Sequence, residues 1–427
     1  MSTEASRRLR NIVGGSAGNL VEWFDWYVYS AFALYFAHAF FPKGDATAQL
    51  LNTAAIFAVG FIVRPIGAWL MGIYADRRGR KAGLTLSVSL MCFGSLLIAL
   101  APTYAQAGLL SPGILLFARL IQGLSLGGEY GSSATYLSEI ADCERRGFWS
   151  SFQYVTIIGG QLAALALLVV LQALLGEDAM QAWGWRIGFA AGAVLAIVVF
   201  IIRRRLDETL SFQNAQASGT RRKSSILTLL FEHPREALLV MALTAGGTAA
   251  FYAYTIYLQK FLANTSGFDR ATASRIMTVA LTVMLLIQPL AGRLSDHLGR
   301  KPMMIFFGVG ATVLTYPIFV ALEQVRTVEA AFALVMLSLI IVTGYTSINA
   351  IVKAELFPAD IRALGVALPY AVANAIFGGT AEYVALYLKD AGHERWFYVY
   401  ISLLSACSLI AYVRMRETRT ASRIEEL

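Results

Sequence analysis

Long apolar runs separated by short polar stretches follow one another along the chain from residue 12 to residue 415. A transmembrane α-helix needs roughly 17 to 25 apolar residues, and each run has about that length. The runs predict twelve transmembrane helices, over residues 12–40, 50–75, 82–102, 109–138, 150–175, 185–202, 236–262, 272–292, 302–322, 329–353, 363–388 and 395–413. We therefore expect an all-α membrane protein without a separate globular domain, and with both termini on one side of the membrane.

The first apolar run begins after Arg7, Arg8 and Arg10, as a secretory signal peptide does. It is too long for a signal peptide, however, and it carries Glu22 and Asp25 in its middle. We expect an uncleaved helix.

The composition supports a membrane protein, since 57% of the residues are hydrophobic and 15% are charged, whereas soluble domains average about 25% charged residues. The net charge is +8, and the basic residues of the predicted loops and tails are unevenly divided between the two sides of the membrane. On the side of the termini there are 24 Lys and Arg, and on the opposite side there are 5. The positive-inside rule then places both termini in the cytoplasm. The placement of the charges thus argues for membrane topology rather than nucleic-acid binding, and the basic residues of the polar stretch 203–235 are expected to lie against lipid headgroups of the bilayer.

Six further basic residues fall inside the predicted helices. Four of them lie near predicted helix ends, from which a long side chain can reach the membrane surface: Arg186, Lys260, Arg275 and Lys353. The other two, Arg64 and Arg119, fall near the middle of the membrane, from which the side chain cannot reach the membrane surface.

Several classes of chemistry have no support in the sequence. The cysteines are far apart and the histidines share no metal-ligand spacing: Cys92, Cys143, Cys407, His38, His233, His297 and His393. The chain has no G-x-x-x-x-G-K-[ST] phosphate loop, and no nucleophile gathers with a histidine and an acid in any predicted span. We expect no enzyme, no metal and no cofactor, and an ion gradient as the energy source.

Two sequence echoes indicate an internal duplication. "GIYADRRGRK" at residues 72–81 returns as "GRLSDHLGRK" at residues 292–301, an offset of 220 residues. A second echo, at an offset of 216 residues, repeats an acid and an arginine: Glu139 and Arg146, then Glu355 and Arg362. Two independent echoes at nearly one offset predict a duplicated six-helix unit.

The duplication divides the chain into an N-terminal half (1–202), a basic cytoplasmic linker (203–235) and a C-terminal half (236–427). The linker is expected to hold a short amphipathic helix at residues 226–231. Parallel repeats of this kind place a substrate site between the halves, near the bilayer midplane.

The loop motif after the second and eighth helices resembles that of the major facilitator superfamily. Within it, "GNLVEWFDWYVYS" and "ARLIQGLSLGGEYGSSATYLSE" resemble the metabolite:proton symporter family, and "SFQYVTIIGGQL", "RRLDET" and "YAVANAIFGGTAEYVAL" extend the resemblance over nearly the whole chain. The resemblance implies a monomeric transporter of the bacterial inner membrane, with protons as the coupling ion. It implies that the substrate is a small dicarboxylate, α-ketoglutarate, imported by alternating access.

Two alternatives stay open. One is symport of another organic acid or of a zwitterion, such as citrate, shikimate or betaine. The other is a transport-dead sensor on the same fold, which would not need a titratable acid in the membrane.

Four residues recur at helical spacing in the first run: Gly18, Glu22, Asp25 and Tyr29. They share one helix face, which we expect to point into the bundle. An ionised carboxylate at mid-membrane is costly, so it takes up a proton or pairs with a cation. Asp25 is nearer the middle of its span and is the expected proton site, with Glu22 as support; a static ion pair is the alternative.

The fourth predicted helix carries Arg119, Gln122, Leu126 and Glu129 on one stripe. Sugar-porter relatives have an Asp–Arg pair at matching positions, so the resemblance implies that Asp25 pairs with Arg119. Arginine keeps its proton, and protonation of Asp25 is therefore expected to free Arg119. Glu129 is a further candidate for proton coupling.

Arg64 follows Gly60 by one helical turn and precedes Pro65. A guanidinium can bind a carboxylate through two parallel hydrogen bonds, so Arg64 and Arg119 together suit a dianion. The alternative for Arg64 is a structural partner of a buried acid. Four polar residues are further candidates for substrate binding, with packing as the alternative for each: Tyr154, Tyr370, Gln153 and Asn374.

The superfamily resemblance implies that charged residues in the cytoplasmic loops pair with helix ends and hold that side closed: Asp76, Arg80, Glu139, Arg146, Asp296, Arg300, Glu355 and Arg362. Glu382 is placed toward the outer end of the eleventh helix, where a role at the membrane interface is expected rather than proton coupling.

Overall fold

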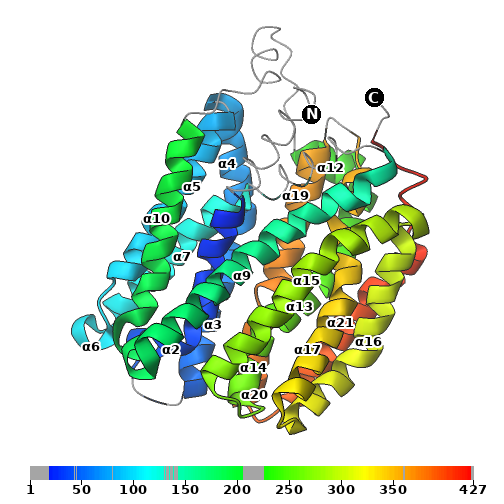
Figure 1. Cartoon of the computed structure of the whole chain (residues 1–427). Helices are drawn as coiled ribbons and strands as arrows, with labels where there is room; N and C mark the ends of the chain where they lie inside the picture. The colour runs from blue at the N-terminus through cyan, green and yellow to red at the C-terminus, as the bar shows by residue number, and fades with distance from the viewer. Residues whose placement is uncertain are drawn as a thin grey trace, which may run out of the picture.

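The computed structural model describes residues 19–424 except residues 43, 45, 79, 129, 131–133, 135–137, 139–142, 205–225 and 359–360. The side chains of residues 72–73, 75–84, 143, 202–204 and 363 lie outside the description as well. Within the described residues every regular element is helical. The long helices run side by side in one bundle, and the red end of α21 lies at the right of the view, from where the chain runs up toward the C-terminus (Figure 1).

The first half of the bundle begins with a helix over residues 19–31, which continues past a turn at Phe32 into α2 (Ala33–Phe40). The elements that follow are α3 (Ala46–Ile62), α4 (Arg64–Arg78), α5 (Arg80–Leu100), α6 (Tyr104–Ala107), α7 (Leu110–Gly127), η1 (Cys143–Arg145), α9 (Arg146–Ala179), η2 (Met180–Gly184) and α10 (Trp185–Arg204).

The second half consists of α12 (Ile226–Glu232), α13 (Pro234–Tyr252), η3 (Ala253–Tyr257), α14 (Leu258–Asn264), α15 (Arg270–Leu298), α16 (Arg300–Gln324), α17 (Val328–Thr346), α18 (Asn349–Glu355), α19 (Arg362–Ala373), η4 (Asn374–Gly378), α20 (Ala381–Asp390) and α21 (Arg395–Arg414). The short helix expected at residues 226–231 is present as α12. It buries Leu229 and exposes Leu227, Leu230 and Phe231, as a helix lying against a membrane surface would.

Nine helices within the described residues are long and apolar enough to cross a membrane. One of them, Arg146–Ile201, has 56 residues and contains two predicted spans, because it comprises two helices that meet at a break in the helical backbone. The chain turns there at Gly176, whose φ of 76° favours glycine. Residues 19–40 and the shorter apolar helix Thr85–Leu100 supply two more, so each of the twelve predicted spans has a helical counterpart.

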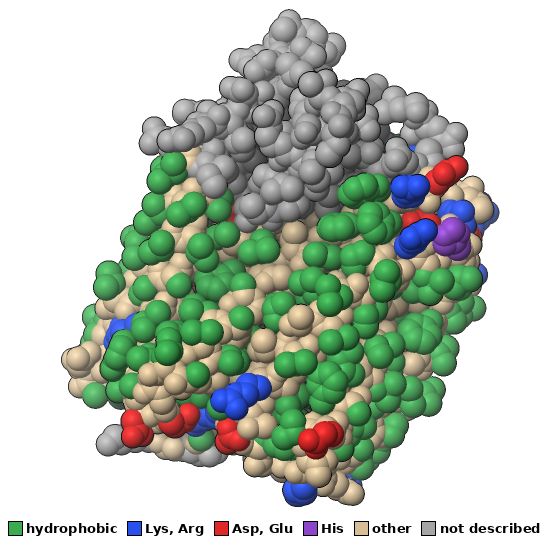
Figure 2. Space-filling view, in the orientation of Figure 1, with side chains coloured by type: hydrophobic (Ala, Val, Ile, Leu, Met, Phe, Trp, Pro, Cys, Tyr) green, Lys and Arg blue, Asp and Glu red, His purple; other side chains and the backbone are tan. Residues whose placement is uncertain are grey.

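Apolar side chains cover the outside of the bundle. Figure 2 shows hydrophobic groups over the middle of the visible face, while Lys, Arg, Asp and Glu gather at its lower edge and upper right. The exposed large apolar residues come from many helices and include Trp69, Phe93, Phe117, Leu286 and Leu403. Soluble monomers rarely expose apolar patches this extensive, so the surface suits contact with lipid.

Candidate functional site

Glycines bring the helices that carry Arg64 and Arg119 into backbone contact. A Cβ on Gly123 would lie 2.1 Å from the carbonyl oxygen of Gly60, and one on Gly127 would lie 2.1 Å from that of Arg64. Gly123 and Gly127 form a G-x-x-x-G pattern, which lets membrane helices approach closely. A larger residue at either position would separate α7 from α3 and α4.

The two arginines share one aromatic surface. The guanidinium carbon lies 4.2 Å from the ring centre of Trp26 in Arg64 and 3.7 Å in Arg119. Arg64 also lies 3.8 Å from the ring of Phe61, and Arg119 lies 4.4 Å from the ring of Tyr29. Both arginines are buried, and the ring faces stabilise their charge in place of water.

Each arginine presents an unused hydrogen-bonding edge. Nε and Nη2 of Arg64, and the same two atoms of Arg119, have no hydrogen-bond partner among the described residues. These two nitrogens form the side-on edge that binds a carboxylate through parallel hydrogen bonds. A buried unpaired donor in a native structure needs an explanation, and reversible binding of an anion provides one.

Asp25 lies at the centre of a polar network in the first half. Ser95 donates a hydrogen bond to Oδ1 of Asp25, and Gln122 Nε2 donates to Oδ2 at 2.9 Å. Gln122 Nε2 also donates to Ser95 Oγ at 2.9 Å. On its other side, Gln122 Oε1 accepts a hydrogen bond from Arg119 Nη1 at 2.8 Å.

The expected direct pair between Asp25 and Arg119 is therefore wrong in its geometry. Gln122 stands between them, accepting from the arginine and donating to the carboxylate. The helical stripe correctly placed Arg119 and Gln122 on the side of Asp25, but spacing does not determine which side chain makes the contact. The coupling role of these residues stays a prediction.

The structure describes only one of the other two acids proposed for proton coupling. Glu22 is buried, as its helix face predicted. Glu129 lies outside the described residues.

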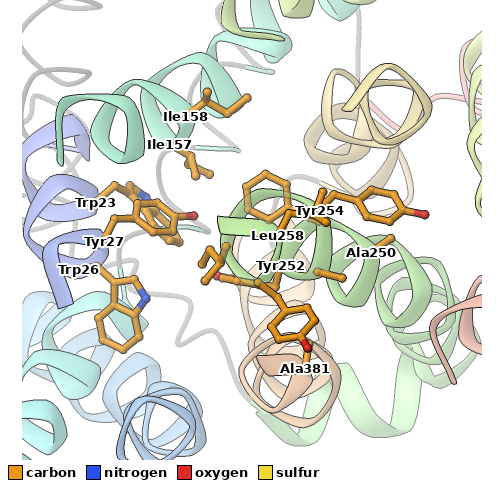
Figure 3. Close-up of a cluster of buried hydrophobic side chains, with 14 of the residues drawn as sticks. Trp23, Trp26, Tyr27, Ile157, Ile158, Ala250, Tyr252, Tyr254, Leu258 and Ala381 are labelled. Atoms are coloured by element: carbon orange, nitrogen blue, oxygen red, sulfur yellow. The ribbon is translucent and has the colours of Figure 1, made fainter. Parts of the chain in front are cut away.

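Tyrosines from both halves gather beside Arg64. Tyr252 of α13 lies next to Arg64, Tyr27 and Asn374. Its ring packs edge-on against Phe61, with 5.1 Å between ring centres. In Figure 3, Trp23, Trp26 and Tyr27 lie on one side of the view and Tyr252 and Tyr254 on the other, with Ile157 and Ile158 of α9 above them. The arginines thus lie near the boundary between the halves.

Of the four polar candidates for substrate binding, Tyr154, Tyr370 and Asn374 belong to this tyrosine cluster or contact it. Tyr370 lies next to Tyr154 and within electrostatic reach of Arg64, and it stacks on Tyr130 with 3.7 Å between ring centres. The Oδ1 atom of Asn374 accepts a hydrogen bond from Thr248, whereas its Nδ2 has no partner among the described residues. Gln153 is buried in α9, one residue from Tyr154.

The structure corrects the expectation for two lysines. Lys260 and Lys353 were expected to reach the membrane surface, but each is only 1% exposed. Arg275 is exposed and Arg186 is partly exposed, so the expectation holds better for these two. Hydropathy places a residue along a helix, but it does not tell whether neighbouring helices cover the side chain.

Lys260 pairs with Glu382. The Nζ atom lies 2.5 Å from Glu382 Oε1 and donates to Ser30 Oγ at 3.0 Å. Lys260 and Glu382 belong to α14 and α20 of the second half, while Ser30 belongs to the first helix. The interface placement expected for Glu382 is wrong, because its side chain is buried in a contact between the halves.

A second contact joins the halves at the end of the bundle where α21 ends. Asp296 of α15 accepts hydrogen bonds from the backbone N–H groups of Gly147 and Phe148, at 2.8 and 3.0 Å. Arg300 Nη1 donates to Asp296 at 2.8 Å, and its Nε lies 3.9 Å from Glu355. Asp296 and Arg300 lie at helix ends rather than in a long loop, since only Gly299 separates α15 from α16.

The other gating candidates divide into described and undescribed residues. Arg362 donates to the carbonyl oxygens of Ala354 and Phe357, and Arg146 is buried within electrostatic reach of Glu355. Glu139 and the side chains of Asp76 and Arg80 lie outside the described residues.

Sequence reasoning did not anticipate that the chain after α21 takes part in this region. Glu417 accepts hydrogen bonds from the backbone N–H groups of Arg300 and Lys301, both at 2.9 Å. Thr418 donates to Glu355 at 2.6 Å. Glu417 thereby binds the first N–H groups of α16, which are free at any helix N-terminus.

The chain matches the model of the sugar (and other) transporter family twice, over residues 11–225 and 210–426. It is 53% identical to the alpha-ketoglutarate permease of Escherichia coli (strain K12), over 99% of this chain and 97% of that protein. It is 32% identical to a citrate-proton symporter of Klebsiella pneumoniae, over 96% of this chain and 92% of that one. A partially occluded inward open structure of the xylose transporter XylE from E. coli superposes with a TM-score of 0.74 at 19% identity, over 92% of this chain and 95% of that chain.

Proposed function

Because the chain belongs to the sugar (and other) transporter family of the major facilitator superfamily, we propose that it imports α-ketoglutarate together with protons by alternating access. Its fold is the all-α, twelve-helix fold of that superfamily, as the sequence predicted. The observation that carries the proposal is the pair of buried arginines whose Nε and Nη2 atoms have no partner among the described residues. A carboxylate substrate supplies the missing acceptors.

In this proposal Arg64 is the first binding group for the dianion, and Arg119 contributes charge behind it. Tyr154, Tyr370, Gln153 and Asn374 supply polar contacts around the substrate. Asp25 is the proton site, with Glu22 and Glu129 as supporting acids. No cofactor takes part besides the coupling proton.

Gln122 links the proton site to the substrate site. It can donate to Asp25 and accept from Arg119 at the same time because the two ends of an amide have opposite hydrogen-bonding character. Protonation of Asp25 weakens the acceptor that holds Nε2, and so loosens the amide that holds Arg119. Proton binding then changes how firmly Arg119 is held beside the substrate.

Transport requires the two halves, residues 1–202 and 236–427, to part at one end at a time while the linker 203–235 keeps them together. The contact of Asp296 with Gly147 and Phe148 is the gate at the end where α21 finishes. The contact of Lys260 and Glu382 with Ser30 is the gate toward the other end. Six further residues would act at the first gate: Asp76, Arg80, Glu139, Arg146, Arg300 and Glu355, with Arg362 anchoring the segment beside them.

Charge arithmetic constrains the coupling. Moving one elementary charge across 100 mV is worth about 2.3 kcal/mol, so a membrane potential that is negative inside opposes entry of a dianion with a single proton. At least two protons must accompany each dianion before the potential stops opposing import.

The chain is a multi-pass membrane protein. We infer that it lies in the bacterial inner membrane, as its bacterial relatives indicate, and that it is a monomer. Both termini are placed in the cytoplasm because 24 basic residues fall on the side of the termini and 5 on the other.

The function is tested with purified protein in proteoliposomes, by following uptake of labelled α-ketoglutarate at two pH values. We expect uptake that requires an inward proton gradient and that unlabelled α-ketoglutarate inhibits more strongly than succinate, citrate, shikimate or betaine does. Stronger inhibition by citrate or betaine would instead identify another substrate of the same family.

Arg64→Lys is expected to weaken α-ketoglutarate binding about tenfold. Lysine keeps the charge but cannot donate two parallel hydrogen bonds, and a hydrogen bond to a charged group is worth about 1.5 to 3 kcal/mol. Calorimetric titration of the purified protein measures the change. The matched control is Arg186→Lys, since Arg186 donates to the carbonyl oxygens of Ala99 and Ala101 away from the site. Equal affinity in both variants would contradict bidentate binding by Arg64.

A further inference from the structure

Lys353 is a buried cation that the proposed transport mechanism has not used. It lies on α18 in the second half, and its Nζ atom donates to Oδ1 of Asn349 at 2.7 Å. Nζ also lies 4.1 Å from the ring centre of Tyr370, 5.5 Å from that of Tyr130 and 5.9 Å from that of Tyr345. Aromatic faces and one amide oxygen therefore form the described surroundings of this ammonium group.

The comparison with Lys260 shows what Lys353 lacks. Both lysines are 1% exposed, but Lys260 has a carboxylate at 2.5 Å, whereas no carboxylate of the described residues lies within ion-pair distance of Lys353. An ammonium group has three N–H donors, and a buried charge without a counter-charge is costly. Lys353 is therefore suited to receive an anion from outside the protein.

Lys353 and Arg64 approach one tyrosine cluster from different halves of the bundle. Tyr370, whose ring faces Lys353, is within electrostatic reach of Arg64. Tyr130 of the first half stacks on Tyr370 with ring planes 11° apart. Its hydroxyl donates to the same Asn349 oxygen that Lys353 uses, at 3.0 Å. This cluster thus links a cation of the second half to a cation of the first.

Arg119 also has an edge of Nε and Nη2 without a partner among the described residues, but its position suits it to share the first carboxylate with Arg64 rather than to receive the far end of a dianion. It contacts the same Trp26 ring as Arg64 and belongs to the same half of the bundle. Its Nη1 atom is held by Gln122, which connects it to Asp25. Arg119 is therefore placed to report on the proton, whereas Lys353 faces the cluster from the opposite half.

We propose that Lys353 binds the second carboxylate of a dicarboxylate whose first carboxylate binds Arg64, so that the substrate bridges the two halves. The proposal rests on the proposed transport of α-ketoglutarate. It makes Lys353 the residue that selects dicarboxylates over monocarboxylates, because a substrate with one carboxylate leaves the ammonium group without a partner. Bridging also gives the substrate a direct means of drawing the halves together.

The test compares α-ketoglutarate with 2-oxopentanoate, which has the same five-carbon chain but a single carboxylate. Binding of each is measured by calorimetry on the purified full-length protein. Lys353→Gln is expected to weaken α-ketoglutarate binding about 10- to 100-fold, as loss of a charged hydrogen bond does. Binding of 2-oxopentanoate should change less than about twofold on the same reasoning, since it does not use the second cation. Lys353→Arg should keep most of the preference, and Arg275→Gln, which removes an exposed cation, should keep all of it.

Three outcomes would overturn the proposal. The first is a Lys353→Gln protein that still prefers the dicarboxylate. The second is equal weakening of both ligands, which would indicate a structural role. The third is recovery of dicarboxylate binding in a Glu129→Gln, Lys353→Gln double variant, which would mean that the lysine only balances that acid. If Lys353→Gln does not fold, Lys353→Met is measured in its place with the same expected loss of preference. Failure of the unaltered protein to bind α-ketoglutarate contradicts the transport function itself and is thereby distinguished from failure at Lys353.

Discussion

Asp25→Asn is expected to abolish accumulation of α-ketoglutarate driven by a pH gradient while leaving counterflow exchange in place. Asparagine matches the shape of a protonated aspartate but cannot release a proton. A difference of one pH unit is worth about 1.4 kcal/mol, or tenfold accumulation, for each coupled proton. The variant should lose this accumulation entirely, because it cannot carry the proton. Counterflow should persist, because exchange of substrate for substrate needs no net proton movement. Proteoliposomes with an imposed pH gradient measure accumulation, and preloaded proteoliposomes measure counterflow.

Two variants separate the proton site from its surroundings. Ser95→Ala removes the hydroxyl that donates to Oδ1 of Asp25 but leaves the carboxylate, so it should shift the pH dependence of transport and preserve accumulation. Glu22→Gln tests the second acid of the same helix face in the same way. Accumulation that survives in Asp25→Asn and disappears in Glu22→Gln would move the proton site to Glu22.

Much of the fold followed from the sequence because bilayer thickness constrains it strongly. Runs of apolar residues predicted the number and order of the spans, while the duplication that the echo between Asp76 and Asp296 indicates stays a prediction. Helix ends were less well predicted. The fifth span breaks at Gly176, next to its predicted end, but the residues that follow form further helical turns through η2 (Met180–Gly184) instead of an open loop.

The site was only partly predictable, for a geometric reason. The burial of Arg64, Arg119 and Asp25 could be predicted, because charged side chains at mid-helix are costly to expose to lipid. Their roles in binding and coupling stay predictions. Lys260 and Lys353 were missed because both fall within a few residues of a predicted helix end. In the structure α13, η3 and α14 continue without interruption to Asn264, and other helices cover both lysines. The only signal in the sequence was that two lysines interrupt otherwise apolar segments, and this signal does not distinguish a buried cation from one that reaches the surface.

Gln122 illustrates a further limit. Its position on the stripe with Arg119 was evident from spacing, but its place between Asp25 and Arg119 depends on side-chain rotamers that three helices fix together. Ser95 comes from α5, Asp25 from the first helix and Gln122 from α7. Since the network needs all three helices at their final distances, it is a property of packing and not of any one segment.

Removal of one partner of the buried pair between Lys260 and Glu382 is expected to give the largest loss of stability. Lys260→Met should lower the free energy of unfolding by about 3 to 5 kcal/mol, because it leaves Glu382 buried without its counter-charge. The double variant Lys260→Met, Glu382→Leu should recover most of this loss, since replacing both members of a buried ion pair by apolar residues is often neutral. Detergent-induced unfolding of the purified variants measures the differences.

The pair between Lys389 and Glu394 provides the matched control. It also joins a lysine to a glutamate, but at 3.5 Å and with both side chains 19% exposed. Lys389→Met should therefore cost no more than about 1 kcal/mol. Equal losses in the Lys260→Met and Lys389→Met proteins would show that burial does not set the strength of the pair.

The double variant at Lys260 and Glu382 also tests the proposed gate. Ser30 loses the hydrogen bond from the Lys260 ammonium that ties it to the second half, so the gate should open more readily while the fold stays intact. Faster counterflow at unchanged stability is the expected sign that this ion pair controls opening of the gate.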